Sequence, residues 1–132
     1  MIKRNYAVII LVDGQGRVLL QKRDNYKEKY ANYWAFFGGG IEKSETPEQA
    51  LKRELKEELN YNLEEVKLFK VIDYKTDDKE GKGYYFIADF EGKIENLSLK
   101  EGAGFAFLTK KEISFLSLNL MDCGILKEYF EK

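Results

Sequence analysis

The most informative stretch of the sequence is GGIEKSETPEQALKRELKEELNY, residues 39–61, because it joins a glycine turn to a strongly marked helix. Thr46 offers a hydroxyl N-cap, Pro47 suits the first helical position, and Gln49 lies three residues after the cap, where it can bond back to the cap's backbone. The pattern therefore predicts a helix that begins at Pro47.

Acidic residues share one face of this expected helix. Glu54, Glu57 and Glu58 stand at positions i, i+3 and i+4, so their side chains project on the same side. Leucines at similar spacing form an adjacent apolar stripe that we expect to be buried: Leu51, Leu55 and Leu59. Like charges this close destabilise an isolated helix by about 0.2–0.5 kcal/mol per pair, a cost that a divalent cation would reverse. The acidic face is therefore a candidate metal site.

The segment 39–61 resembles the Nudix box, the signature of the Nudix hydrolases. That signature is a glycine, five residues, a glutamate, seven residues and then R-E-U-x-E-E-x-G-U, in which U is a bulky apolar residue. The matching positions here are Gly39, Glu45, Arg53, Glu54, Leu55, Glu57, Glu58, Asn60 and Tyr61. All charged positions agree, while Asn60 replaces the usual glycine and Tyr61 the usual aliphatic residue. Asparagine tolerates the left-handed conformation that ends many helices, so Asn60 can replace glycine there.

The resemblance implies a role for each charged residue of the box. Glu54, Glu57 and Glu58 become the metal ligands and catalytic carboxylates of a hydrolase. Three other residues support the structure of the box, with an ion pair fixing the loop to the helix: Gly39, Glu45 and Arg53. The backbone carbonyl of Gly38 is a candidate further ligand, since a glycine turn lets the main chain approach an ion. Oxygen ligands and a pyrophosphate substrate together favour Mg²⁺, with Mn²⁺ as a possible substitute.

Two residues outside the box join the candidate site. Glu101, in the segment LKEGAGFAFL, resembles a glutamate that Nudix proteins of the nucleoside triphosphate pyrophosphohydrolase type use to bind a second metal ion or as the base. The alternative is an acidic side chain in a solvated turn. Arg23 ends an expected strand and resembles a basic residue that relatives place on a substrate phosphate, the alternative being a strand-end arginine in solvent.

Composition limits the classes of function. The 132 residues carry 22 basic and 23 acidic side chains, so the net charge of −1 provides no overall field that would attract a polynucleotide. The absence of histidine excludes histidine triads, histidine-bound zinc and a histidine base, so carboxylates must supply the base. Cys123 is the only cysteine, which excludes an internal disulfide and fits a reducing, cytoplasmic compartment. No apolar run approaches the ~20 residues of a membrane span.

The order of expected elements predicts the fold class. Residues 1–132 form one expected domain, in which a polar loop over 24–33 and a charged loop over 76–83 separate regular elements. The expected strands cover residues 2–12, 17–23, 34–37, 66–74, 84–90 and 103–108, and further helices cover 110–115 and 118–130. Mixed strands and helices in one small domain indicate an α+β fold. The resemblance makes it an α/β/α sandwich with a central mixed β-sheet.

The resemblance also implies an activity. We expect Mg²⁺-dependent hydrolysis of a phosphoanhydride bond in a nucleoside di- or triphosphate derivative, giving a nucleoside monophosphate and a second phosphorylated product, for nucleotide-pool house-cleaning. The alternatives are a dinucleoside polyphosphate, ADP-ribose or nucleotide-sugar pyrophosphatase, or a nucleotide-binding sensor without catalysis. The partner is thus a small nucleotide, and both a monomer and a homodimer remain open.

Aromatic and amide side chains could contact the nucleobase. Tyr30, Tyr33, Trp34 and Phe36 are candidates for stacking, although packing in the core or a loop is the simpler interpretation for each. Asn119 could contact a base edge from the start of the last helix, but we interpret it as an N-cap.

Overall fold

The computed structural model describes residues 1–24, 31–100 and 102–131. Its strands are β1 (Ile2–Lys3), β2 (Tyr6–Val12), β3 (Val18–Lys22), β4 (Trp34–Ala35), β5 (Phe37–Gly40), β6 (Lys67–Lys75), β7 (Lys79–Asp89) and β8 (Gly104–Leu108). Its helices are α1 (Pro47–Leu59), α2 (Lys110–Ile113) and α3 (Leu120–Phe130), with a short 3₁₀ turn, η1 (Ile94–Asn96).

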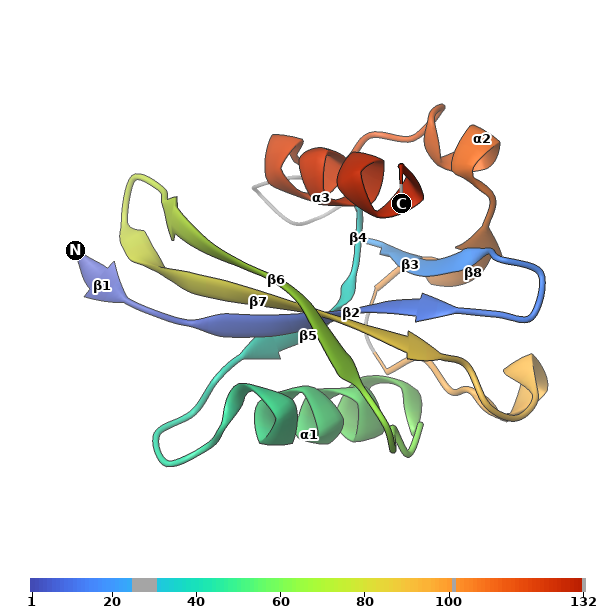
Figure 1. Cartoon of the computed structure of the whole chain (residues 1–132), viewed down its shortest axis with the longest axis horizontal. Coiled ribbons are helices and arrows are strands. Elements are labelled where there is room, and N and C mark those ends of the chain that lie inside the picture. Colours follow the sequence, from blue (N-terminus) through green and yellow to red (C-terminus); the bar gives the residue numbers. More distant parts are fainter. Residues whose placement is uncertain (25–30, 101, 132) are drawn as a thin grey trace.

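The elements form three layers, with a sheet between two layers of helix (Figure 1). Helix α1 lies on one face of the sheet, and α2 and α3 lie on the other. The sheet is mixed, because β2 pairs parallel with β7 but antiparallel with β3 and β5. The predicted α+β fold, an α/β/α sandwich with a central mixed sheet, is confirmed.

The strand β2 is the centre of the sheet. Its first half pairs with β5, with Val8 opposite Gly38 and Tyr6 opposite Gly40. Its other edge pairs with β7 along its whole length, from Tyr6 opposite Gly83 to Val12 opposite Asp89. Strand β5 therefore lies in the sheet only through β2, and this places the glycines of the box beside the middle of the molecule.

Boundaries of most elements differ from the sequence prediction by one or two residues, and three differences are larger in consequence. The expected strand over 2–12 is broken between β1 and β2, where the Asn5 side chain accepts a hydrogen bond from the backbone of Lys82 (2.8 Å). The expected strand over 34–37 is divided at Phe36 into β4, which pairs with β3, and β5, which pairs with β2. The charged loop expected over 76–83 is wrong beyond residue 78: β7 begins at Lys79, because solvated side chains do not prevent the backbone from pairing with β1 and, from Glu80 on, with β6.

Helix α1 has the ends that the sequence predicts. The Thr46 hydroxyl accepts from the Gln49 backbone and the Gln49 side chain accepts from the Thr46 backbone, which completes a capping box. Asn60 ends the helix in the left-handed conformation, with φ 57° and ψ 35°. The helix therefore spans Pro47–Leu59 with its three glutamates at fixed positions.

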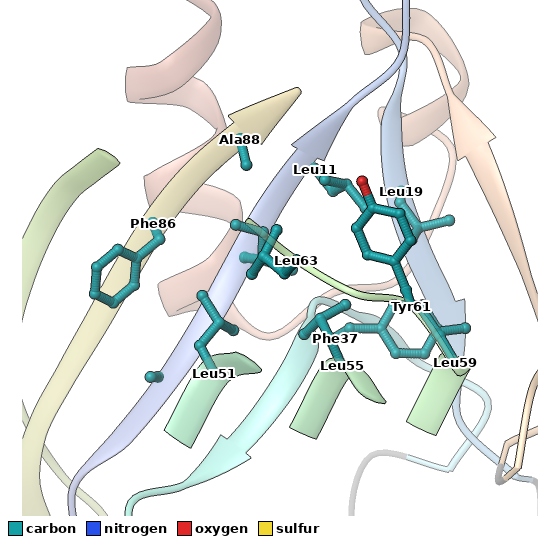
Figure 2. Packing of buried hydrophobic residues seen from close by; sticks show 12 residues of the cluster. Leu11, Leu19, Phe37, Leu51, Leu55, Leu59, Tyr61, Leu63, Phe86 and Ala88 are labelled. Atoms are coloured by element: carbon teal, nitrogen blue, oxygen red, sulfur yellow. The ribbon is translucent and has the colours of Figure 1, made fainter. Parts of the chain in front are cut away.

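Two hydrophobic clusters lie on opposite faces of the sheet. Under α1, the three leucines of the predicted stripe are fully buried against side chains such as Phe37, Leu11 and Phe86 (Figure 2). Burying one leucine side chain stabilises a fold by about 1.5–3 kcal/mol, so this stripe holds α1 firmly. The second cluster packs α3 against the other face and includes Tyr85 and Phe36. Among the residues described, no helix has the length and apolar character needed to cross a membrane.

Candidate active site between the glycine strand and helix α1

Two glycines of β5 let the helix carboxylates reach the strand. A Cβ added to Gly39 would lie 2.7 Å from the carboxyl carbon of Glu54, so only glycine leaves room for that carboxylate over the strand. Gly38 has a φ of 137°, a conformation that side-chain-bearing residues rarely adopt. The Gly38 backbone N–H donates to Glu58 Oε1 at 3.2 Å. Glu54 and Glu58 thus meet the same short segment of strand.

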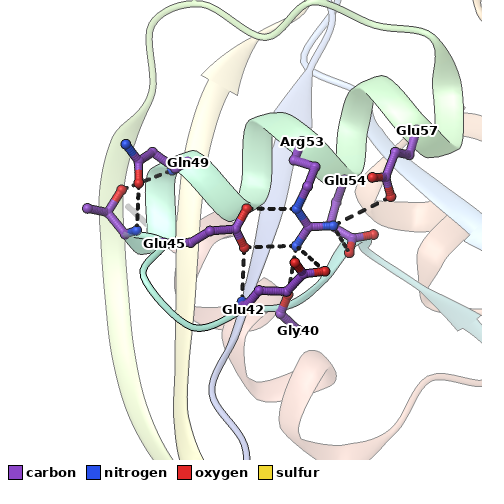
Figure 3. A network of polar contacts seen from close by, with 8 residues as sticks. Gly40, Glu42, Glu45, Gln49, Arg53, Glu54 and Glu57 are labelled. Atoms are coloured by element: carbon purple, nitrogen blue, oxygen red, sulfur yellow. Dashed lines mark hydrogen bonds and ion pairs between the residues drawn. The ribbon is translucent and has the colours of Figure 1, made fainter.

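Arg53 is the centre of an ion-pair network beside these carboxylates (Figure 3). Its guanidinium binds Glu45 through two hydrogen bonds, Nε to Oε2 at 2.7 Å and Nη2 to Oε1 at 2.9 Å. Nη1 donates to Glu54 Oε1 at 2.9 Å and lies 3.5 Å from Glu57 Oε2. Nη2 also donates to the backbone carbonyl of Gly40 at 3.2 Å. The arginine therefore joins the loop before α1, the helix and β5, and the expected Glu45–Arg53 ion pair is present.

The network changes the protonation of its members. Hydrogen bonds from Arg53, together with one from the Glu42 backbone, lower the pKa of Glu45 to about 2. Hydrogen bonds to Glu45 and then to Glu54 raise the pKa of the Arg53 guanidinium further above its ordinary value. Both partners consequently stay charged at every pH near neutrality, so the loop over 41–46 stays attached to the helix.

The remaining acid of the helix face is open to solvent. The Glu57 side chain is 59% exposed, compared with 18% for Glu54. Within the described part of the chain, its carboxylate has one polar contact, with Arg53 Nη1 at 3.5 Å. Glu57 can therefore turn towards a ligand at little structural cost.

The oxygen atoms that could bind a metal ion are of the kind that a hard cation prefers, although they do not converge on one point. In the part of the chain that the structure describes, no three acidic, histidine or cysteine side chains converge closely enough to hold a metal ion. Arg53 engages Glu54 and Glu57, and the Gly38 N–H engages Glu58. All available donors are oxygens on one helix face and one strand, and this is the chemistry that Mg²⁺ requires.

The candidate residues outside the box lie at the edges of this region or outside the described residues. Arg23 follows β3 directly, and its backbone N–H donates to the Tyr33 carbonyl at 2.8 Å. Its contact with a substrate phosphate stays a prediction. Glu101 and Tyr30 lie outside the described residues. Asn119 is the N-cap of α3, since its side chain accepts from the Asp122 backbone at 2.8 Å. This confirms the capping interpretation.

Besides the contact of Glu58 with Gly38, sequence reasoning missed two features. The first is the contact of Arg53 with Gly40, which depends on the β5 backbone and has no local sequence signal. The second is a buried hydrogen-bonded group formed by Tyr6, Tyr85 and Asp122 on the other face of the sheet. The sequence indicated this group only through the presence of an aspartate, Asp122, in the largely apolar helix expected over 118–130.

The sequence is similar to a known protein family and to characterised proteins. The family model described as NUDIX domain matches residues 1–123. RNA pyrophosphohydrolase from Teredinibacter turnerae is 46% identical over 63 residues, which cover 48% of this chain and 34% of that protein. The 8-oxo-dGTP diphosphatase of Proteus vulgaris is 32% identical over 93 residues, which cover 70% of this chain and 82% of that protein.

A solved structure shows the same fold. The crystal structure of the MutT protein from Methanosarcina mazei matches with a TM-score of 0.85, 14% sequence identity and coverage of 98% of this chain and 94% of the other. The fold and the site thus define an α/β/α sandwich that presents helix carboxylates to a glycine strand. The chain belongs to the Nudix hydrolase family. It spans about a third of the length of the Teredinibacter relative.

Proposed function

We propose that this protein hydrolyses a phosphoanhydride bond in a nucleoside di- or triphosphate derivative with the help of Mg²⁺, releasing a nucleoside monophosphate and pyrophosphate or another phosphorylated product. One observation carries the proposal: Glu54 and Glu58 reach the glycine segment of β5 while Glu57 lies exposed beside them. A surface helix with accidental acid spacing would not need glycines opposite its carboxylates.

The ligands that we propose for the ion are Glu54, Glu57, Glu58 and the Gly38 carbonyl, with Glu101 as a further candidate. When bound, the ion would neutralise phosphate charge and favour ionisation of the attacking water. Mn²⁺ offers similar coordination and is the expected substitute.

The chain's own residues have separate tasks in this proposal. Gly39 leaves space for a carboxylate, and the Glu45–Arg53 pair holds the loop over 41–46, which follows the glycines of β5. Because the chain has no histidine, a carboxylate accepts the proton of the attacking water, and Glu101 is a candidate for that role. Arg23 is the candidate for binding a substrate phosphate through its guanidinium.

The names of the relatives favour two substrate classes. The Proteus relative is named for 8-oxo-dGTP, which agrees with house-cleaning of nucleoside triphosphates. The Teredinibacter relative is named for RNA, so a 5′-triphosphate RNA belongs among the test substrates. Dinucleoside polyphosphates, ADP-ribose, nucleotide sugars and the role of a sensor without catalysis remain alternatives. We further propose that residues 1–132 act as one domain and that the protein is cytoplasmic, because its single cysteine fits a reducing compartment.

The test is release of phosphorylated products from a substrate panel with and without Mg²⁺ or Mn²⁺. The panel contains nucleoside triphosphates, oxidised nucleotides, 5′-triphosphate RNA, dinucleoside polyphosphates, ADP-ribose and nucleotide sugars. We expect metal-dependent turnover, and we expect Glu57→Gln to lower kcat/KM by about a hundredfold or more because it removes a ligand of the ion.

The matched control is Glu48→Gln on the same helix. Among the described residues, Glu48 forms one ion pair, with Lys52 at 3.2 Å, and it lies in the first turn of α1, so its loss should leave kcat/KM unchanged. Equal activity of wild type and Glu57→Gln would overturn the metal-site assignment. Nucleotide binding without turnover would replace the hydrolase by the sensor alternative.

A further inference from the structure

A chain of hydrogen bonds, buried at Tyr85 and Asp122 and half-buried at Tyr6, joins β2, β7 and α3 on the face of the sheet opposite α1. The hydroxyls of Tyr6 and Tyr85 lie 2.7 Å apart, and Tyr85 donates to Asp122 Oδ1 at 3.0 Å. Asn119 Nδ2 donates to the other carboxylate oxygen at 3.1 Å. Tyr85 is fully buried, and Asp122 is 7% exposed. We call Tyr6, Tyr85 and Asp122 the tyrosine–aspartate chain.

The ring of Tyr85 contacts the strand that forms the candidate site. It packs edge-on against Phe36, with the ring centroids 5.9 Å apart and the planes at 79°. Phe36 is 5% exposed and lies between β4 and β5, two residues before Gly38. A displacement of the Tyr85 ring would thus move Phe36, the residue that directly precedes β5.

The register of the sheet provides a second connection. Val8 of β2 is opposite Tyr85 on one side and opposite Gly38 on the other. Tyr6, the outer member of the tyrosine–aspartate chain, is itself opposite Gly40. The two tyrosines therefore lie in the same rows of the sheet as Gly38, which binds Glu58, and Gly40, which binds Arg53.

A third connection runs through the start of α3. The Trp34 backbone N–H donates to the Ser117 carbonyl at 2.8 Å, so the segment before α3 holds the first residue of β4. Asn119, which caps α3, also binds Asp122. The short segment 117–122 consequently carries both the hydrogen bond that holds β4 and those that join α3 to Tyr85.

We propose that Tyr85 and Asp122, assisted by Tyr6, are positioning residues that fix β5 for the reaction at Glu54, Glu57 and Glu58. Apolar packing alone tolerates small shifts, whereas a buried hydrogen-bond chain has one favoured geometry. A displacement of about 1 Å at a reacting centre can cost about a hundredfold in rate. The inference rests on the proposed hydrolase function.

The polar composition of the chain supports positioning over simple stability. A buried carboxylate without an ion pair is costly, and well-packed apolar residues of similar volume are often at least as stable. Among the described residues, Asp122 is the one buried position occupied by a polar or charged side chain. Its donors are two neutral groups, from β7 and from the cap of α3, so the chain contributes orientation at a cost in stability.

The decisive variant is Tyr85→Phe, which removes the hydroxyl but keeps the ring against Phe36. The matched control is Tyr129→Phe, the same change in the same cluster, where the ring packs against Phe69 and Phe130. Two measurements are made on both proteins: backbone hydrogen exchange across the whole chain, and kcat and KM for the substrate found in the panel. Tyr6→Phe is a milder second variant, since Asp122 keeps both of its donors.

In Tyr85→Phe we expect exchange at residues 36–40 to rise about fivefold or more relative to the rest of the sheet. We expect kcat to fall about tenfold with little change in KM, because alignment and not ground-state binding is lost. Tyr6→Phe should change both in the same direction by less, and Tyr129→Phe should change neither.

A uniform rise in exchange across the sheet, or unchanged exchange at 36–40, would overturn the positioning role. The exchange measurement needs no substrate, so it still decides the inference if the wild-type protein hydrolyses nothing in the panel. In that case the hydrolase proposal fails, and a selective rise at 36–40 identifies the chain as a support of β5 independently of it.

Discussion

At the scale of single residues, Gly39 is the clearest test of how the strand admits the helix carboxylates. In Gly39→Ala the new Cβ would lie 2.7 Å from the carboxyl carbon of Glu54 and 2.9 Å from both its oxygens, so that side chain must move. We expect kcat/KM to fall about tenfold or more, because a ligand is displaced from its position. The unfolding free energy should fall by less than about 1 kcal/mol, since the moving atoms end a flexible side chain.

Gly14→Ala is the control for this change. A Cβ at Gly14 meets nothing within 4 Å, so both activity and stability should stay near the wild-type values. Steady-state kinetics and urea unfolding measure the two quantities. If Gly39→Ala retains full activity, catalysis does not depend on the position of the Glu54 carboxylate above the strand.

Sequence alone identified the residues that interact through local spacing but not those brought together by strand pairing. The Glu45–Arg53 ion pair was expected because both residues belong to a fixed pattern around one helix start. The contact of Arg53 with Gly40, and that of Glu58 with Gly38, depend on how β5 lies beside α1. The hydrogen bond of Asp122 was harder still to predict from the sequence, because its partner Tyr85 is 37 residues away in the chain.

At the scale of elements, the end of α1 offers a separate prediction. Asn60 adopts φ 57° and donates its backbone N–H to Lys56 at 3.0 Å, so the position requires a left-handed residue. We expect Asn60→Ala to lower the unfolding free energy by about 1 kcal/mol, because a Cβ without a polar group makes this conformation costly. Asn60→Gly should stay within about 0.5 kcal/mol of wild type.

Urea unfolding of the two Asn60 variants gives the comparison. Each is the control of the other, since they remove the same amide and differ in the Cβ. Equal destabilisation by alanine and glycine would mean that the amide, and not the left-handed backbone, determines the stability of this helix end.

Elements with strong local signals were predictable, and exposed strands were not. Helix α1 was predicted from its first residue because cap, proline and leucine stripe agree. The start of β7 was missed because Lys79 to Lys82 carry no apolar alternation and because Gly81 is typical of a turn. These residues are strand because Glu80 to Lys82 pair with β6 and Lys79 pairs with Ile2 of β1, interactions between segments that the side-chain pattern does not report.

At the scale of the whole molecule, two carboxyl groups should give stability a maximum in mildly acidic solution. Burial raises the pKa of Asp122 from the ordinary 3.8 to about 6, against the opposing hydrogen bonds from Tyr85 and Asn119. The folded protein therefore binds this proton more tightly than the unfolded chain does. The resulting stabilisation is present below about pH 4 and is lost as the pH rises through 6. The free energy of unfolding changes by on the order of 3 kcal/mol over this range.

Glu45 acts in the opposite direction. Its pKa falls from the ordinary 4.5 to about 2 because Arg53 binds the ionised form, so its contribution is present above pH 4.5 and is lost as the pH falls towards 2. Unfolding free energies from urea titrations between pH 2 and pH 8 should thus decline on both sides of a maximum near pH 4–5. Asp122→Asn should flatten the decline between pH 4 and 6 and leave the acid side, while Glu45→Gln should weaken the acid side alone. A decline above pH 4 that persists in Asp122→Asn would show that another group causes it, because the variant has no carboxyl to ionise at that position.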